Sequence, residues 1–341
     1  MALPSLAGVR AVTAASRAPA AIGYLPWWIS PGWRDLALSQ LGRVVLFDAP
    51  VGQDGSVQTR EWPAGIGAPA LDLALTLFEH THFDELFTHA ERRARLLAQA
   101  TELLGQAFIS GLHLDIEGYA QAAPQAVRGF RDWLALLDER RRSLGKTLSA
   151  FYPASDSFVP YDAQAARRID YWVAQLYDAH WPESKKSGPL VTRRAENPVA
   201  VPQALARLGA LGVQRSQVLL SVPLYGWEWP TESEHPGSLA LGRARLVTYT
   251  ETPQQLMPND RLAATALVRQ HGLRRDGEET PYYVHRDGVQ WRQGWFEDLH
   301  SLTHKLAAER AAGYAGLAFF PLGYDRGEVV EAMLRWWGAA R

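Results

Sequence analysis

The chain has 341 residues, of which 47% are hydrophobic and 21% are charged, and its formal net charge is −1 at pH 7. These values are ordinary for a globular protein, no apolar run reaches the ~18 residues of a membrane-spanning helix, and there is no basic field for nucleic acid. Because the sequence contains no cysteine, it excludes disulfides, thiolate catalysis and thiolate metal sites.

The first 20 residues are rich in alanine and carry two arginines, but they lack the apolar centre of about 7–15 residues found in a secretory signal. We expect residues 1–20 to be a mobile leader and residues 21–341 to form a single domain. The compartment stays open, with an exported location favoured.

Short apolar or β-branched segments recur from residue 21 onward and are the expected strands. They are "AIGY" (21–24), "RVVLF" (43–47), "LDLALTL" (71–77), "GLHLDIE" (111–117), "TLSAFY" (147–152), "YWVAQLY" (171–177), "QVLLSVPLY" (217–225) and "GLAFF" (316–320). Between them lie segments whose apolar residues recur every three or four positions, which predicts helices over 90–107, 127–145, 202–212 and 297–313. Glycines that can end these helices stand at Gly105, Gly145, Gly212 and Gly313.

Eight strands alternating with helices predict a parallel sheet closed into a (β/α)8 TIM barrel, a fold of typically about 250 residues. An open dinucleotide-binding sheet is disfavoured because no glycine-rich phosphate loop follows the first strand. The long gap before the last strand predicts a small α+β insertion between strands 7 and 8, at about 226–296, on the active face of the barrel.

The stretch "GLHLDIEGY" (111–119) places His113, Asp115 and Glu117 at alternating positions. Side chains of a strand alternate between its faces, so these three share one face. One interpretation is a surface strand with water on its charged face. In a barrel, however, the carboxyl ends of the strands surround the active site, and we therefore predict that this face points inward.

The motifs together resemble glycoside hydrolase family 18, the chitinase family, over nearly all of residues 21–341. "SGLHLDIE" (110–117) keeps the glycine, the last aspartate and the glutamate of its Asp-Gly-x-Asp-x-Asp-x-Glu signature. The other matching segments, in order, are "IGYLPWW" (22–28), "VVLFDAPVGQDGSV" (44–57), "QLYD" (175–178), "SVPLYGWEW" (221–229) and "YAGLAFFPLGYD" (314–325).

The resemblance implies a glycosidase that cleaves a polymer containing β-linked N-acetylhexosamine by a retaining, substrate-assisted and endo-acting route. It implies Glu117 as the proton donor, Asp115 as the partner of the acetamide N–H and Tyr177 as a donor to the acetamide oxygen. Substrate-binding candidates are Asp178, His113, Tyr24, Trp27, Tyr225, Trp227 and Phe320, although core packing explains Tyr225 and Trp227 equally well. We expect a polysaccharide or glycan as the partner, no cofactor, no metal and a monomer.

The sequence departs from the family pattern at several positions. Ser110 and His113 replace the first two signature aspartates, and His113, either as a neutral donor or as a cation, could keep Asp115 anionic. Phe320 stands where the family has a tryptophan, or Phe319 does if the alignment slips by one residue. "LTLFEHTHFDE" (75–85) replaces a Gly-Gly turn and is expected to be a loop, its histidines solvated or at the cleft rim rather than binding metal.

Two other functions stay open. The chain could be a non-catalytic, lectin-like sugar-binding protein on the same barrel, or a scaffold with a vestigial site. Retention of both Asp115 and Glu117 favours an enzyme, and His113 makes bacterial cell-wall or exopolysaccharide material at least as good a substrate as chitin. No Gly-x-Ser-x-Gly elbow supports a Ser-His-Asp hydrolase.

Overall fold

A computed structural model describes residues 18–29, 36, 38–62, 65–117, 121–155, 159–251 and 262–339. Most of the expected leader lies outside the described residues. Eight parallel strands close into a barrel in the order β1-β14-β7-β6-β5-β4-β3-β2. They are β1 (Ala21–Pro26), β2 (Arg43–Pro50), β3 (Leu71–Leu77), β4 (Gly111–Ile116), β5 (Thr147–Tyr152), β6 (Tyr171–Ala174), β7 (Val218–Pro223) and β14 (Gly316–Phe320). The predicted TIM barrel is thereby confirmed.

Each predicted strand segment overlaps one of these barrel strands. β1 and β2 run beyond their predicted segments, to Pro26 and Pro50, whereas β6 and β7 end earlier than predicted, in the region of the site. β6 ends at Ala174, so Tyr177 lies in the loop beyond it. β7 ends at Pro223, and Tyr225 already begins β8 (Tyr225–Thr231), which belongs to a second sheet. Proline cannot donate a ladder hydrogen bond, which is consistent with a break at this point.

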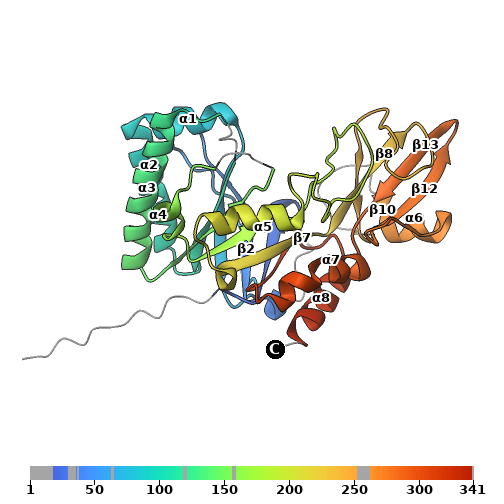
Figure 1. Ribbon diagram of the computed structural model, residues 1–341. Helices are drawn as coiled ribbons and strands as arrows, with labels where there is room; N and C mark the ends of the chain where they lie inside the picture. The colour runs from blue at the N-terminus through green and yellow to red at the C-terminus, as the bar shows by residue number, and fades with distance from the viewer. Residues whose placement is uncertain are drawn as a thin grey trace, which may run out of the picture.

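Helices cover the outside of the barrel (Figure 1). They are α1 (His80–Thr88), α2 (Ala90–Gly105), α3 (Pro124–Ser143), α4 (Ala163–Ala166), α5 (Val201–Ala210), α7 (Leu299–Ala311) and α8 (Glu328–Gly338), with short 3-10 turns η1 (Trp27–Ile29), η3 (Leu38–Gln40) and η4 (Arg215–Gln217). Among the described residues, no helix is long and apolar enough to cross a membrane.

The expectation of a loop over residues 75–85 is wrong in its second half, because α1 begins at His80. Phe83 and Phe87 are fully buried, and their rings lie 5.7 and 5.1 Å from the ring of Phe130 on α3. Residues four apart share one face of a helix, so this pair fixes the segment as helical against α3. The helix was not predicted because the segment begins with polar residues and its apolar pattern is short.

Between β7 and β14 the chain forms a second sheet of six strands in the order β10-β9-β8-β13-β12-β11. Besides β8, its strands are β9 (Arg245–Thr248), β10 (Leu262–Ala263), β11 (Arg274–Arg275), β12 (Pro281–Asp287) and β13 (Gln290–Trp295), accompanied by α6 (Ala264–His271). Figure 1 shows this sheet beyond α7, on the side of the barrel away from α1 to α4.

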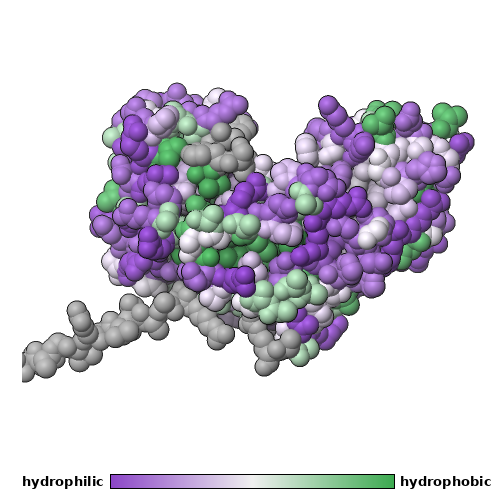
Figure 2. Space-filling view, viewed as in Figure 1, coloured by the Kyte–Doolittle hydropathy of each residue, from purple (hydrophilic) through white to green (hydrophobic). Residues whose placement is uncertain are grey.

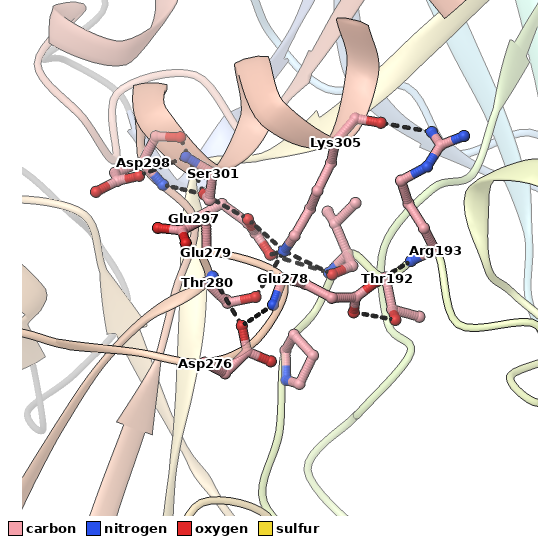
Figure 3. Close-up of polar contacts among 12 residues, drawn as sticks. Thr192, Arg193, Asp276, Glu278, Glu279, Thr280, Glu297, Asp298, Ser301 and Lys305 are labelled. Carbon is pink, nitrogen blue, oxygen red and sulfur yellow. Dashed lines mark hydrogen bonds and ion pairs between the residues drawn. The ribbon is translucent and has the colours of Figure 1, made fainter. Parts of the chain in front are cut away.

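A buried lysine joins the second sheet to the barrel (Figure 3). Lys305 on α7 is fully buried, and its Nζ lies 2.8 Å from Oε1 of Glu297 and 2.8 Å from Oγ1 of Thr280, which precedes β12. The same amine donates to the backbone oxygen of Val191, in the loop between β6 and α5, at 2.7 Å. Since a buried ammonium requires such partners, Lys305 fixes three chain segments relative to one another.

Candidate active site

The polar row of β4 points into the barrel. The ring nitrogen Nε2 of His113 lies 2.9 Å from the hydroxyl of Tyr24 on β1, which stands across the interior because β2 and β3 separate β1 from β4. Leu112 and Leu114, on the other face, are fully buried. Both faces of β4 are therefore covered, which rules out the surface-strand interpretation.

A cavity of about 180 Å³ lies at the carboxyl end of the barrel strands. Its wall runs from Phe78, just before α1, to Tyr225 at the start of β8, and Figure 2 shows the surface notched between the α1 side of the barrel and the second sheet. The lining residues are Tyr24, Phe47, Phe78, Asp115, Glu117, Phe151, Gln175, Tyr177, Asp178, Tyr225 and Phe320.

Two larger hollows, of about 660 and 540 Å³, lie elsewhere, one beside α5 and α7 and the other between the β6–α5 loop and the second sheet. The smaller cavity is the better candidate site because three carboxyl groups, those of Asp115, Glu117 and Asp178, line it among aromatic rings. Convergent ionisable groups in an apolar pocket are typical of active sites.

The cavity brings together most of the residues that the sequence singled out. All three residues with an implied catalytic role, Glu117, Asp115 and Tyr177, line it. So do the substrate-binding candidates Tyr24, Asp178, Tyr225 and Phe320. The remaining candidates, His113, Trp27 and Trp227, are not among its lining residues.

Asp115 is in an unusual electrostatic position. Its side chain is buried, and its Oδ1 has no hydrogen-bond partner among the residues that the structure describes. Burial, and secondly the negative charge of Asp48, raises the pKa of the Asp115 carboxyl to about 7. Asp115 therefore changes its charge near neutral pH and has an oxygen free to accept a hydrogen bond from a ligand.

His113 does not act on Asp115 as the sequence suggested. Its Nε2 faces the Tyr24 hydroxyl and its Nδ1 lies 2.9 Å from Oγ of Ser149, so both ring nitrogens are engaged elsewhere. Burial lowers the pKa of His113 to about 3, which makes the imidazole neutral and contradicts the cationic alternative. His113 lies beneath the cavity and supports Tyr24, which does line it.

Asp178 and Tyr225 form a hydrogen-bonded pair on one wall. The Tyr225 hydroxyl donates to Oδ1 of Asp178 at 2.8 Å. Burial raises the pKa of Asp178 to about 6, although the Tyr225 hydrogen bond opposes that rise. The backbone of Asp178 has φ of 66°, a left-handed conformation that aspartate tolerates better than most residues.

Phe320 is the aromatic centre of the cavity. Its ring is nearly parallel to that of Tyr177, with centroids 6.2 Å apart, and meets the rings of Tyr24 and Tyr225 edge-on at 5.7 and 6.3 Å. Phe319, the alternative, is fully buried and is not among the lining residues.

The two tryptophan candidates lie beside the cavity rather than in its wall. The guanidinium of Arg60 lies over the ring of Trp27, 4.3 Å from its centroid, so that this face is already occupied. Trp227 is half-buried and packs edge-on against Tyr225, with centroids 5.4 Å apart.

Asp48, whose charge raises the pKa of Asp115, and three phenylalanines that line the cavity were not singled out as site residues from the sequence. Asp48 lies near the carboxyl end of β2, where a polar side chain could have been noticed by the same strand-end rule that identified Asp115. Phe47, Phe78 and Phe151 carried no comparable signal, because an apolar residue at a strand end is usually core.

The family model described as "Glycosyl hydrolases family 18" matches residues 78–325 of the chain. A search among curated proteins gave no match.

Among solved structures, the fold is similar to a class V chitinase from Nicotiana tobaccum bound to NAG4, with a TM-score of 0.77, 14% identity, and 93% of this chain and 98% of that chain covered. It is also similar to the chitinase-like agglutinin of Robinia pseudoacacia, with a TM-score of 0.74 and 17% identity over 94% of this chain and 100% of that one. Catalytic domain 2 of a Group II chitinase from Ostrinia furnacalis gives a TM-score of 0.74 and 18% identity over 94% and 96% of the two chains. Identities this low establish the shared barrel, while the family match covers more than half of the sequence. The chain belongs to glycosyl hydrolase family 18.

Proposed function

We propose that this protein is a retaining glycoside hydrolase that cleaves a polysaccharide containing β-linked N-acetylhexosamine. The observation that carries the proposal is the presence of Asp115, Glu117 and Tyr177 in the wall of one cavity. A binding protein has no need of a proton donor beside a second carboxyl group, whereas glycoside hydrolysis needs an acid at the leaving oxygen.

In the proposed reaction the acetamide oxygen of the substrate attacks the anomeric carbon while the glycosidic bond breaks. Glu117 gives its proton to the leaving oxygen and, in the second half, accepts a proton from the water that attacks the same carbon. Asp115 accepts the acetamide N–H through its free Oδ1, and in its charged form it stabilises the positive charge of the cyclic intermediate.

Tyr177 would donate its hydroxyl to the acetamide oxygen. Burial, and then the charge of Asp178, raises the pKa of Tyr177 well above its usual value, so its proton is retained for that hydrogen bond. The parallel contact between Tyr177 and Phe320 leaves an aromatic floor on which a sugar ring could stack.

Glu117→Gln is the direct test. The variant should lose release of reducing ends from N-acetylglucosamine oligomers and peptidoglycan, while oligomer binding measured by calorimetry survives. Glu102→Gln, at an exposed position of α2, is the matched control and should keep wild-type activity. Release of no reducing ends by the wild type from any such polymer would contradict the proposal.

The second candidate is a lectin-like protein, since a chitinase-like agglutinin has the same fold. This candidate predicts oligosaccharide binding without product, and equal binding by the wild type and Glu117→Gln. Peptidoglycan and exopolysaccharide lie outside the cytoplasm, and we infer an exported location on that ground.

A further inference from the structure

Asp48 is held in place by a hydroxyl and a cation. The Thr76 hydroxyl on β3 donates to its Oδ2 at 3.1 Å, and Nε of Arg60 donates to its Oδ1 at 3.1 Å. Asp48 itself is 8% exposed, whereas the side chain of Arg60 is 35% exposed. Both oxygens of Asp48 are thus engaged, and its carboxylate has a fixed direction.

Thr76 on β3 links Asp48 to Asp115, because its hydroxyl donates to Asp48 while its backbone pairs with Asp115 on β4. Asp48 itself lies in an irregular stretch of the β2–β3 register, just before Ala49. Asp48, Thr76 and Asp115 therefore form a row across three neighbouring strands at the mouth of the barrel. One carboxylate of the row is fixed by donors, while the other has a buried oxygen that finds no partner among the residues the structure describes.

We propose that Asp48 is a positioning residue that sets the charge of Asp115, so that the two carboxyl groups hold one proton between them near neutral pH. Two buried carboxylates in neighbouring positions cannot both be ionised without repulsion, and the one that has fewer donors takes the proton. Asp48 has the donors, so Asp115 takes the proton and gives it up to water as the pH rises. The charge coupling itself does not depend on the proposed function, whereas its role in catalysis rests on it.

Burial raises the pKa of Asp115 most, and the charge of Asp48 follows it. His113 is neutral, and burial, followed by the charges of neighbouring acids, raises the pKa of the buried tyrosines Tyr24 and Tyr177 above the neutral range. Arg60 is the cation tied to the pair through Asp48. The titratable or charged groups that face Asp115 from the surrounding elements are Tyr24, Asp48, Arg60, His113, Glu117, Tyr161, Tyr177 and Asp178.

The test is a carboxyl ¹³C NMR titration of Asp115 in the full chain without substrate, with its signal assigned by its loss in Asp115→Asn. Asp48→Asn should lower the midpoint by about one pH unit or more, because a neighbouring negative charge is removed. Arg60→Gln should raise it, because a compensating positive charge is removed. Asp54→Asn, an exposed carboxylate in the turn after β2, changes the net charge equally and should leave the midpoint unchanged.

An unchanged midpoint in Asp48→Asn, or a midpoint lowered by Arg60→Gln, would overturn the inference. Arg60 is partly exposed, so its variant gives an answer even if Asp48→Asn fails to fold. Since the titration uses no substrate, its result is separate from the outcome of the hydrolysis assay. A shifted midpoint in a protein that cleaves nothing would uphold the charge coupling and refute the proposed function.

Discussion

Replacement of Asp115 by asparagine should stabilise the protein, and increasingly so as the pH rises. Burial and the charge of Asp48 raise the pKa of this carboxyl from 3.8 to about 7. Above about pH 4 the unfolded chain therefore loses the Asp115 proton, while the folded protein keeps it until about pH 7. The folded state binds more protons in this window, so the contribution of Asp115 to stability falls as the pH rises through it. Asparagine does not titrate and escapes that loss.

The size of the effect follows from the shift. A difference of about three pH units, at about 1.36 kcal/mol per unit, gives an upper limit of about 4 kcal/mol above pH 7. The two proteins should differ little at about pH 4, where Asp115 is largely protonated in both folded and unfolded states. Active sites often hold residues that lower stability, so a gain of stability on replacing one of them is expected.

Urea unfolding of the wild type and Asp115→Asn, at about pH 4 and about pH 8, measures the difference in the free energy of unfolding. Asp54→Asn is the control, because hydrogen bonds from Ser56, and not burial, dominate the lowered pKa of the exposed Asp54. A gain in Asp115→Asn that is equal at both pH values, or a loss at the higher one, would refute the reasoning.

Three further outcomes are expected. Lys305→Met leaves Glu297 buried without its cation and should cost about 3–5 kcal/mol in urea unfolding, whereas Lys305→Met combined with Glu297→Leu should cost clearly less; equal losses would contradict this. Tyr225→Phe removes a hydrogen bond that lowers the pKa of Asp178. In this variant an NMR titration should place the midpoint of the Asp178 carboxyl above the wild-type value of about 6, and a lower midpoint would contradict the reasoning. Phe320→Ala should raise KM for oligosaccharides more than it lowers kcat, with unchanged steady-state constants as the opposing result.

The barrel could be predicted from the sequence because its strands are short, apolar and separated by helices with clear periodicity. β3, β5 and β14 were predicted with the bounds that the structure has. The ends of β6 and β7 could not be predicted, because the apolar pattern continues through Tyr177 and Tyr225 while the hydrogen bonding does not. α1 was missed because only its buried phenylalanines reveal a helix.

The candidate site could be predicted from the sequence where a polar residue stands in an otherwise apolar strand. That signal identified Asp115 on β4 and Glu117 directly after it, and the resemblance added Tyr177 and Asp178. The raised pKa of Asp115 could not be predicted from the sequence, because it depends on burial and on Asp48, which lies two strands away in the barrel. The partners of His113 are likewise non-local, since Tyr24 and Ser149 reach it from β1 and β5.

In the proposed function, the cavity cleaves a glycosidic bond with the help of the substrate's own acetamide. The most direct measurement is NMR of the products from one defined oligosaccharide in fully N-acetylated and de-N-acetylated forms, with the anomers resolved at early times. We expect the acetylated form to give a product that retains the β configuration, and the de-N-acetylated form not to be cleaved. Inverted product, or equal cleavage of both forms, would contradict this expectation.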